Sequence, residues 1–167
     1  HSLLAGRVIL AAAALEPRSR GRLTLRSADP EEPPVLEHGY LSDPEGRDLR
    51  VLVEGVARVR ELAAAEPLRP LLGAELPASR GDVSAAVRRL HAHYFHPVGT
   101  CAMGDVCDGR GRLLGLERVR VADCSLMPVV PRANTNVPAV VVAERVADWL
   151  LDARPSHAGE RIRTSEG

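Results

Sequence analysis

The stretch VRVADCSLMPVVPRANTNVPAVVVAERVAD, residues 119–148, decides the fold of this chain. Its first five residues are typical of a short buried strand that ends at Asp123. A loop with two prolines leads to Asn134-Thr135-Asn136, and the apolar segment 137–151 that follows is predicted to be a helix. Pro138 favours a helix start, because a proline in the first turn loses no intrahelical hydrogen bond. The stretch therefore predicts a strand, an ordered loop and a helix in direct succession.

The loop at residues 134–136 has more polar side chains than a helix start needs. An Asn or Thr at this place caps backbone N–H groups that lack a partner in the first turn. The start of a helix is also its positive pole, which favours a bound anion. Capping explains one Asn. It does not explain the second Asn or the long apolar segment that precedes them. The loop is therefore a candidate binding site.

The rest of the chain is predicted to contain two more helices and few strands. Residues 47–65 carry apolar side chains at helical spacing and end before Pro67, and a second helix is predicted from about Asp82 to about Phe95. The run at residues 8–15 fits a strand or a short helix, since its periodicity does not decide. With the strands, this predicts a mixed α and β fold.

Two short segments near the start have strand character. RLTLRS, residues 22–27, alternates between polar and apolar residues, which predicts a strand with Leu23 and Leu25 facing inward. A short extended segment is predicted again at the start of residues 35–46, after a loop that three prolines restrict.

HAHYFHPVGT, residues 91–100, holds three of the six histidines of the chain. The spacing suggests a zinc site, but in a helix over 82–95 the side chains of His91 and His93 would point roughly 160° apart. A carboxylate or thiol to complete a tetrahedral set is also missing nearby. We therefore predict no metal here, and we assign His91 and His93 to the polar face of the helix.

His96 differs from the other two histidines because Pro97 follows it. A proline disfavours helical backbone at the residue before it, so His96 is predicted to leave the helix at its end. Gly99 allows a close approach of backbone or ligand. A histidine in this setting suits proton transfer near neutral pH. Taken alone, the motif is more often that of a structural histidine beside a proline turn.

Composition limits the classes of function. The 167 residues suffice for one domain and a tail, and the formal net charge of zero removes a bulk electrostatic argument for nucleic acid or an anionic membrane. Three cysteines form no disulfide framework, which favours a reducing, cytoplasmic location, with peripheral membrane association left open. No signal peptide is recognisable, and the start without Met suggests a piece of something larger.

Six motifs together resemble the C-terminal part of the glucose–methanol–choline (GMC) flavin oxidoreductases, of the choline-dehydrogenase-like type. They occur in the order of that family, and the resemblance covers about residues 15–151. The motifs are PRSRGRLTLRSADP (17–30), PPVL (33–36), YLSD (40–43), HPVGTCAMG (96–104), VRVADCSLMP (119–128) and NTNVPAVVVAERVAD (134–148).

The resemblance implies an α+β fold in which helices pack on an antiparallel sheet that floors the substrate site. The last strand and helix would complete an FAD domain. Residues 1–152 would form the C-terminal, substrate-binding domain, and residues 153–167 a polar, disordered tail.

The resemblance also assigns roles. His96 would accept the hydroxyl proton of an alcohol as a hydride passes to the flavin, and Asn134 would hydrogen-bond the substrate oxygen. Oxygen or another acceptor would then take the electrons. Four further residues would contact FAD: Asp123 and Cys124 along its ribityl–diphosphate part, and Asn136 and Val137 at the pyrimidine edge of the flavin.

Three departures from the family pattern matter. The G-x-G-x-x-G fingerprint of the FAD-binding half is missing, so that half is expected as a partner, encoded upstream or as a separate chain. Cys124 stands where the family more often has Ala or Gly, and we interpret it as a packing residue. Arg132 replaces a small residue; solvent exposure is the simpler reading, and contact with an acidic substrate or acceptor the other.

Two other classes of function differ in how well they fit the sequence. A chain without its FAD-binding half can act as a non-catalytic interaction module, because the missing half would leave apolar surface exposed. A hydrolase is disfavoured, since Ser125 lacks the G-x-S-x-G elbow that exposes a nucleophilic serine.

Overall fold

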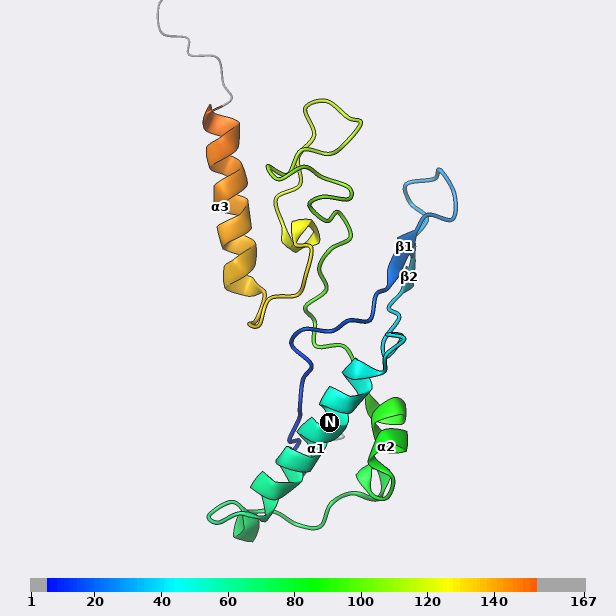
Figure 1. Cartoon of the computed structure of the whole chain (residues 1–167), viewed down its shortest axis with the longest axis vertical. Helices are drawn as coiled ribbons and strands as arrows, with labels where there is room; N and C mark the ends of the chain where they lie inside the picture. Colours follow the sequence, from blue (N-terminus) through cyan, green and yellow to red (C-terminus); the bar gives the residue numbers. More distant parts are fainter. Residues whose placement is uncertain (1–5, 153–167) are drawn as a thin grey trace, which may run out of the picture.

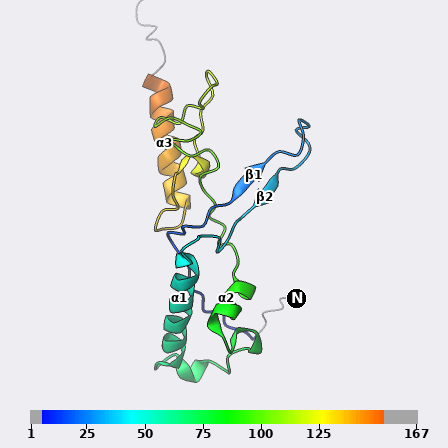
Figure 2. The ribbon, with the colours of Figure 1, turned by 45° about the vertical axis from the view of Figure 1, so that its right-hand side comes forward.

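A computed structural model describes residues 6–152 of the chain. The two helices α1 and α2 pack together at one end of the long axis, and α3 lies at the other end beside the loops that precede it (Figure 1 and Figure 2). A small hairpin projects from the middle. The elements are β1 (Arg22–Thr24), β2 (Val35–Glu37), α1 (Arg47–Ala64), α2 (Val83–Leu90) and α3 (Asn136–Asp152), with short 3-10 turns at Arg69–Leu71, Pro77–Ser79 and Cys124–Leu126.

The antiparallel sheet is smaller than the resemblance implied. Within residues 6–152 it has two strands, and β1 pairs with β2 in the register Leu23 opposite Leu36. The inward orientation predicted for Leu23 and Leu25 was wrong, because no layer covers the hairpin and these side chains are 44% and 75% exposed.

The strand predicted at residues 119–123 does not form. Val121 N–H donates to Gly111 C=O at 2.8 Å, and Arg120 forms only an isolated bridge with Arg112. Left-handed backbone at Gly111 (φ 73°) and Arg118 (φ 61°) interrupts the extended conformation on both sides of this contact. The short apolar segment therefore forms isolated contacts and no continuous ladder of strand hydrogen bonds.

Helix α1 confirms the prediction for residues 47–65 almost to the residue. Its N-cap residue, Gly46, has no side chain, and the capping comes from Asp43, whose carboxylate accepts hydrogen bonds from the N–H groups of Arg47 and Asp48. The apolar run at 8–15 forms neither of the predicted alternatives. It runs past α1 so closely that a Cβ at Gly55 would lie 2.6 Å from the Cβ of Ala12.

Asp48 joins the first turn of α1 to the segment before the hairpin. Its carboxylate accepts from Arg18 N–H (2.9 Å), from Ser19 N–H (2.8 Å) and from the Ser19 hydroxyl (2.6 Å). The residue is only 3% exposed. Burial alone would raise the pKa of Asp48, but the hydrogen bonds from Arg18 and Ser19 outweigh it and hold the pKa below its ordinary value.

The core of the other half forms where α3 packs on the loops. Cys107, Leu126 and Val146 are buried completely or almost so. Burial also raises the pKa of the Cys107 thiol, which makes it a packing group rather than a nucleophile. The opposite side of α3 is left open, with exposed side chains of Val137, Val140, Val141 and Leu151.

Val146→Ala is expected to lower the free energy of unfolding by about 2 kcal/mol, because two buried methyl groups are lost and the cavity between α3 and the loops only partly closes. Val140→Ala on the same helix is the matched control, since Val140 is 54% exposed. Urea unfolding followed by circular dichroism measures both. Equal midpoints for the two variants would contradict this packing.

Candidate functional site

The second helix ends five residues before the predicted end. Helix α2 stops at Leu90, and His91 already has extended backbone (φ −58°, ψ 146°). The His91 ring closes the helix, because its Nδ1 lies 3.2 Å and 3.0 Å from the carbonyl oxygens of Val87 and Arg88. The prediction of a helix to Phe95 was therefore wrong, and so was the assignment of His93 to that helix.

The residues after α2 alternate as in an extended chain. The ring of His91 meets Tyr40 edge-on at 5.7 Å, and the ring of His93 stacks on His38 at 6.5 Å. The ring of Phe95 contacts His93 at 4.2 Å. Every second side chain thus turns toward the loop after β2, as period two requires. These ring contacts lie on one side of the extended segment that follows Leu90.

The predicted angle of roughly 160° between the side chains of His91 and His93 required a helix over residues 82–95. Because the helix ends at Leu90, that angle does not apply. Both turn to the same side, toward His38 and Tyr40. Within residues 6–152 no group of three or more His, Cys, Asp or Glu side chains lies close enough to hold a metal ion.

His96 lies on the other side of this segment, where it meets the loop before α3. Its Nδ1 is 3.0 Å from the hydroxyl oxygen of Thr135, a residue 39 positions further along the chain. The Tyr94 ring packs edge-on against the imidazole at 5.1 Å. Phe95, which precedes His96, has left-handed backbone (φ 58°), and Pro97 follows it. The imidazole is thus half-buried and held from several sides.

Three backbone hydrogen bonds fix the segment that follows His96. Gly99 N–H donates to Cys124 C=O (3.4 Å), Cys101 N–H to Ser125 C=O (2.9 Å) and Met103 N–H to Leu126 C=O (3.0 Å). Gly99 has a φ of 86°, and a Cβ there would come within 3.2 Å of a backbone carbonyl. A glycine is therefore needed at this position for the two segments to approach each other.

Two of the predicted cofactor residues, Asp123 and Cys124, lie at this junction. Asp123 is exposed and accepts a hydrogen bond from Ser125 N–H at 2.8 Å, which caps the short turn at Cys124–Leu126. The Cys124 thiol donates to Thr135 C=O at 3.8 Å, so it ties this turn to the loop before α3.

The loop before α3 carries the remaining predicted residues. Asn134, Asn136 and Val137 are all exposed, whereas Thr135 between them is buried. Thr135 C=O accepts the first hydrogen bond of the helix, from Ala139 N–H at 2.8 Å. The fold thus brings the loop of Asn134 to His96, and the contact is made through Thr135.

Thr135 is the residue that sequence reasoning missed in this role. As one residue of a polar loop it was a candidate helix cap, and nothing in its neighbours indicates a histidine 39 positions away. Only the tertiary structure brings the two together.

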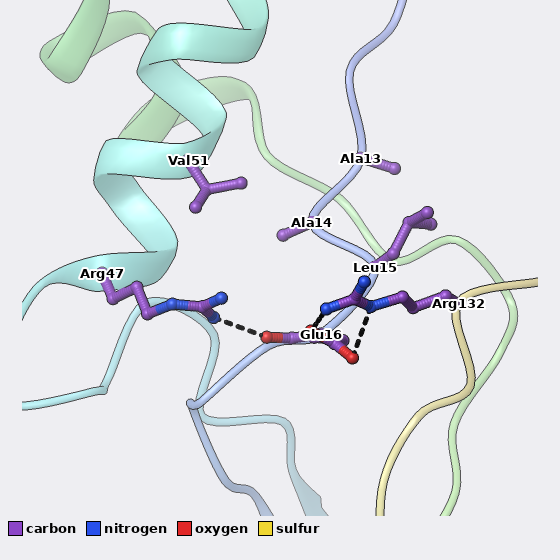
Figure 3. Close-up of a pocket in the computed structure, with 7 residues that line it drawn as sticks. All are labelled: Ala13, Ala14, Leu15, Glu16, Arg47, Val51 and Arg132. Atoms are coloured by element: carbon purple, nitrogen blue, oxygen red, sulfur yellow. Dashed lines mark hydrogen bonds and ion pairs between the residues drawn. The ribbon is translucent and has the colours of Figure 1, made fainter.

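Arg132 forms an ion pair beside the site. Its guanidinium lies 2.6 Å from a carboxylate oxygen of Glu16, at the rim of an open depression of about 310 Å³ (Figure 3). Arg47 donates to the backbone carbonyl of Glu16 at 2.8 Å from the other side. The hydrogen bond from Arg132 lowers the pKa of Glu16. Arg132 is exposed, as expected, but its charge is already paired.

The comparisons with known proteins show the family of this chain. The family model described as GMC oxidoreductase, specific for the C-terminal domain, matches residues 17–143. The chain therefore belongs to the GMC oxidoreductases and corresponds to their C-terminal domain. It is 39% identical over 161 residues to an uncharacterised GMC-type oxidoreductase of Mycobacterium tuberculosis, covering 90% of this chain and 29% of that protein.

Relatives with described activities show the same partial coverage. Choline oxidase of Arthrobacter globiformis is 37% identical over 154 residues, which are 86% of this chain and 28% of that enzyme. Among solved structures, formate oxidase matches with a TM-score of 0.73 at 26% identity, over 81% of this chain and 25% of that one. The chain thus spans between a quarter and three tenths of the length of these relatives.

Proposed function

We propose that this chain is the substrate-binding, C-terminal portion of an FAD-dependent oxidoreductase that oxidises an alcohol CH–OH group to a carbonyl. The family match and the similarity to choline oxidase support this proposal. The observation that carries the proposal is the hydrogen bond between His96 and Thr135, because it brings the loop of Asn134 to the imidazole.

His96 acts as the general base in this proposal. The alcohol O–H bond breaks and its proton moves to the imidazole, while the carbon that carries the hydroxyl would give its hydride to bound FAD and become a carbonyl carbon. An imidazole suits this step because it changes protonation state near neutral pH. Asn134, which is exposed at the same loop, donates a hydrogen bond to the substrate oxygen and orients it.

The residues at the start of α3 fit one edge of a flavin. The first N–H groups of a helix lack intrahelical partners, and those of Asn136 and Val137 belong to exposed residues. With Asp123 and Cys124 they would hold part of the cofactor. FAD, when bound, supplies the hydride acceptor. A partner half must supply the nucleotide cradle, since no G-x-G-x-x-G stands in this sequence.

A non-catalytic interaction module is the alternative function. The observation in its favour is the open side of α3, where Val137, Val140 and Val141 are more than half exposed. Such a surface favours association with another protein. Under the main proposal the FAD-binding half covers this side.

Reconstitution tests the two functions. The chain is purified alone and together with the FAD-binding half encoded upstream, and each sample is titrated with FAD and then given primary and secondary alcohols under anaerobic conditions. We expect stoichiometric FAD only in the joint sample, and bleaching of its flavin absorbance by an alcohol. A joint sample that holds FAD but is bleached by no alcohol contradicts the proposal and favours the interaction module.

A further inference from the structure

We propose that Thr135 is a positioning residue that sets the tautomer of His96. In this inference the hydroxyl oxygen of Thr135 accepts a hydrogen bond from Nδ1–H of His96, which leaves the lone pair of Nε2 free to take the alcohol proton. The inference rests on the proposed function, since it names the nitrogen of His96 that accepts the alcohol proton and the residue that keeps this nitrogen unprotonated.

The contact leaves two arrangements to choose between. Nδ1 and the Thr135 hydroxyl oxygen are 3.0 Å apart, which is a normal hydrogen-bond distance. A hydroxyl can donate or accept, and a neutral imidazole has one nitrogen of each kind. If Thr135 donated to Nδ1, the ring proton would sit on Nε2 and that nitrogen could not act as a base.

Acceptance by Thr135 fits both states of the reaction. In the protonated imidazole both nitrogens are donors. A hydroxyl that already accepts from Nδ1–H keeps its place when the alcohol proton arrives at Nε2. A hydroxyl that donated to Nδ1 would have to turn during the step. The accepting arrangement therefore needs no reorganisation at the moment of proton transfer.

Thr135 is held firmly enough for this task. It is 8% exposed, and its carbonyl accepts from Ala139 N–H and from the Cys124 thiol. A β-branched side chain also has restricted χ1 freedom. On the other partner, Tyr94 packs against the imidazole edge-on. Donor and acceptor are thus fixed by separate parts of the fold, α3 on one side and the segment after α2 on the other.

Nitrogen NMR of the full chain tests the assignment directly. The chain is labelled with ¹⁵N-histidine, and long-range proton–nitrogen spectra are recorded at about pH 8.5, where an ordinary imidazole is neutral. His96→Gln identifies the His96 signals among the six histidines. We expect a protonated Nδ1 and an unprotonated Nε2. A wild-type ring that is protonated at Nε2, or that shows no preference, overturns the inference without any further variant.

Two substitutions separate the hydroxyl from the packing. Thr135→Val keeps the shape and removes the hydroxyl, whereas Thr135→Ser keeps the hydroxyl. The valine variant is expected to move the His96 proton toward Nε2, and the serine variant to keep the wild-type pattern. In the complete enzyme, Thr135→Val should lower kcat about 10- to 100-fold with KM little changed, and Thr135→Ser should restore most of the rate. An unchanged tautomer in Thr135→Val overturns the inference.

The outcomes distinguish this inference from the proposed function. A ring protonated at Nε2 in the wild-type chain, together with a large loss of rate in His96→Ala, overturns the role of Thr135 and leaves the base in place. A ring protonated at Nδ1, together with an unimpaired His96→Ala enzyme, overturns the role of His96 as the base in the proposed function and leaves the assignment of the tautomer in place.

Discussion

His96→Ala is expected to slow the bleaching of flavin by an alcohol about 10²- to 10⁴-fold in the enzyme assembled with its FAD-binding half, which is the range that general bases contribute. Alanine removes the nitrogen that takes the hydroxyl proton, and it also removes the partner of Thr135. Stopped-flow absorbance under anaerobic conditions measures the rate. The FAD content of the variant should match that of the wild type, because the imidazole is assigned to the substrate and not to the nucleotide.

His93→Ala is the matched control for this substitution. His93 lies three positions earlier in the same extended segment, but its exposed ring turns toward His38 and away from the loop before α3. Its removal should leave the rate of bleaching within about twofold, as for a surface substitution away from a functional feature. Equal rates in wild type and His96→Ala would show that another group takes the proton.

Asp48→Ala should lower the free energy of unfolding by about 3 kcal/mol. The substitution leaves the N–H groups of Arg18 and Ser19 without their buried acceptor, and each unsatisfied group costs about 1–3 kcal/mol. It also frees the segment before the hairpin from the first turn of α1. Urea unfolding of the full chain, followed by circular dichroism, measures the loss.

Glu54→Ala is the control for Asp48→Ala, because Glu54 is an exposed acid on the same helix. Its removal should change the free energy of unfolding by less than about 0.5 kcal/mol. Similar losses for the two variants would mean that the carboxylate of Asp48 does not join the two segments.

The stabilising effect of Asp48 should also depend on pH. The hydrogen bonds from Arg18 and Ser19 hold its pKa in the folded chain below its ordinary value, against the opposing effect of burial. The ionised form is therefore favoured by folding, so the contribution is complete above the unfolded pKa of about 3.9 and is lost as the pH falls through the folded pKa. The difference in unfolding free energy between wild type and Asp48→Asn should accordingly be constant from about pH 5 to pH 7 and shrink below about pH 4. A difference that grows on acidification would contradict the lowered pKa.

Local patterns predicted the long helices well. Helix α1 has apolar residues at helical spacing and a proline beyond its end, and α3 has Pro138 in its first turn. These features act within a few residues of one another, so the sequence contains them in full. The capping of α1 by Asp43 was not foreseen, because Asp43 lies four and five residues before the N–H groups that it accepts from and reaches them only through the left-handed turn at Gly46.

Features that depend on distant partners were predicted less well. The helical pattern up to Phe95 was continuous, yet the chain is extended after Leu90, where His91 meets Tyr40 and His93 meets His38. The rings of Tyr40 and His38 come from a loop some 50 residues earlier, which no local window contains.

By itself, the sequence determined the order of the motifs, the two long helices and the position of His96 in front of Pro97, since each depends on residue types at short spacing. The tertiary structure alone decided that the Nδ1 atom of His96 lies beside the hydroxyl of Thr135. Hydrogen bonds of the 99–103 segment to 124–126 bring the loop before α3 to the imidazole, and Thr135 makes the contact. A hydrogen bond between residues 39 positions apart depends on how the intervening chain folds back. Composition and periodicity do not predict that conformation.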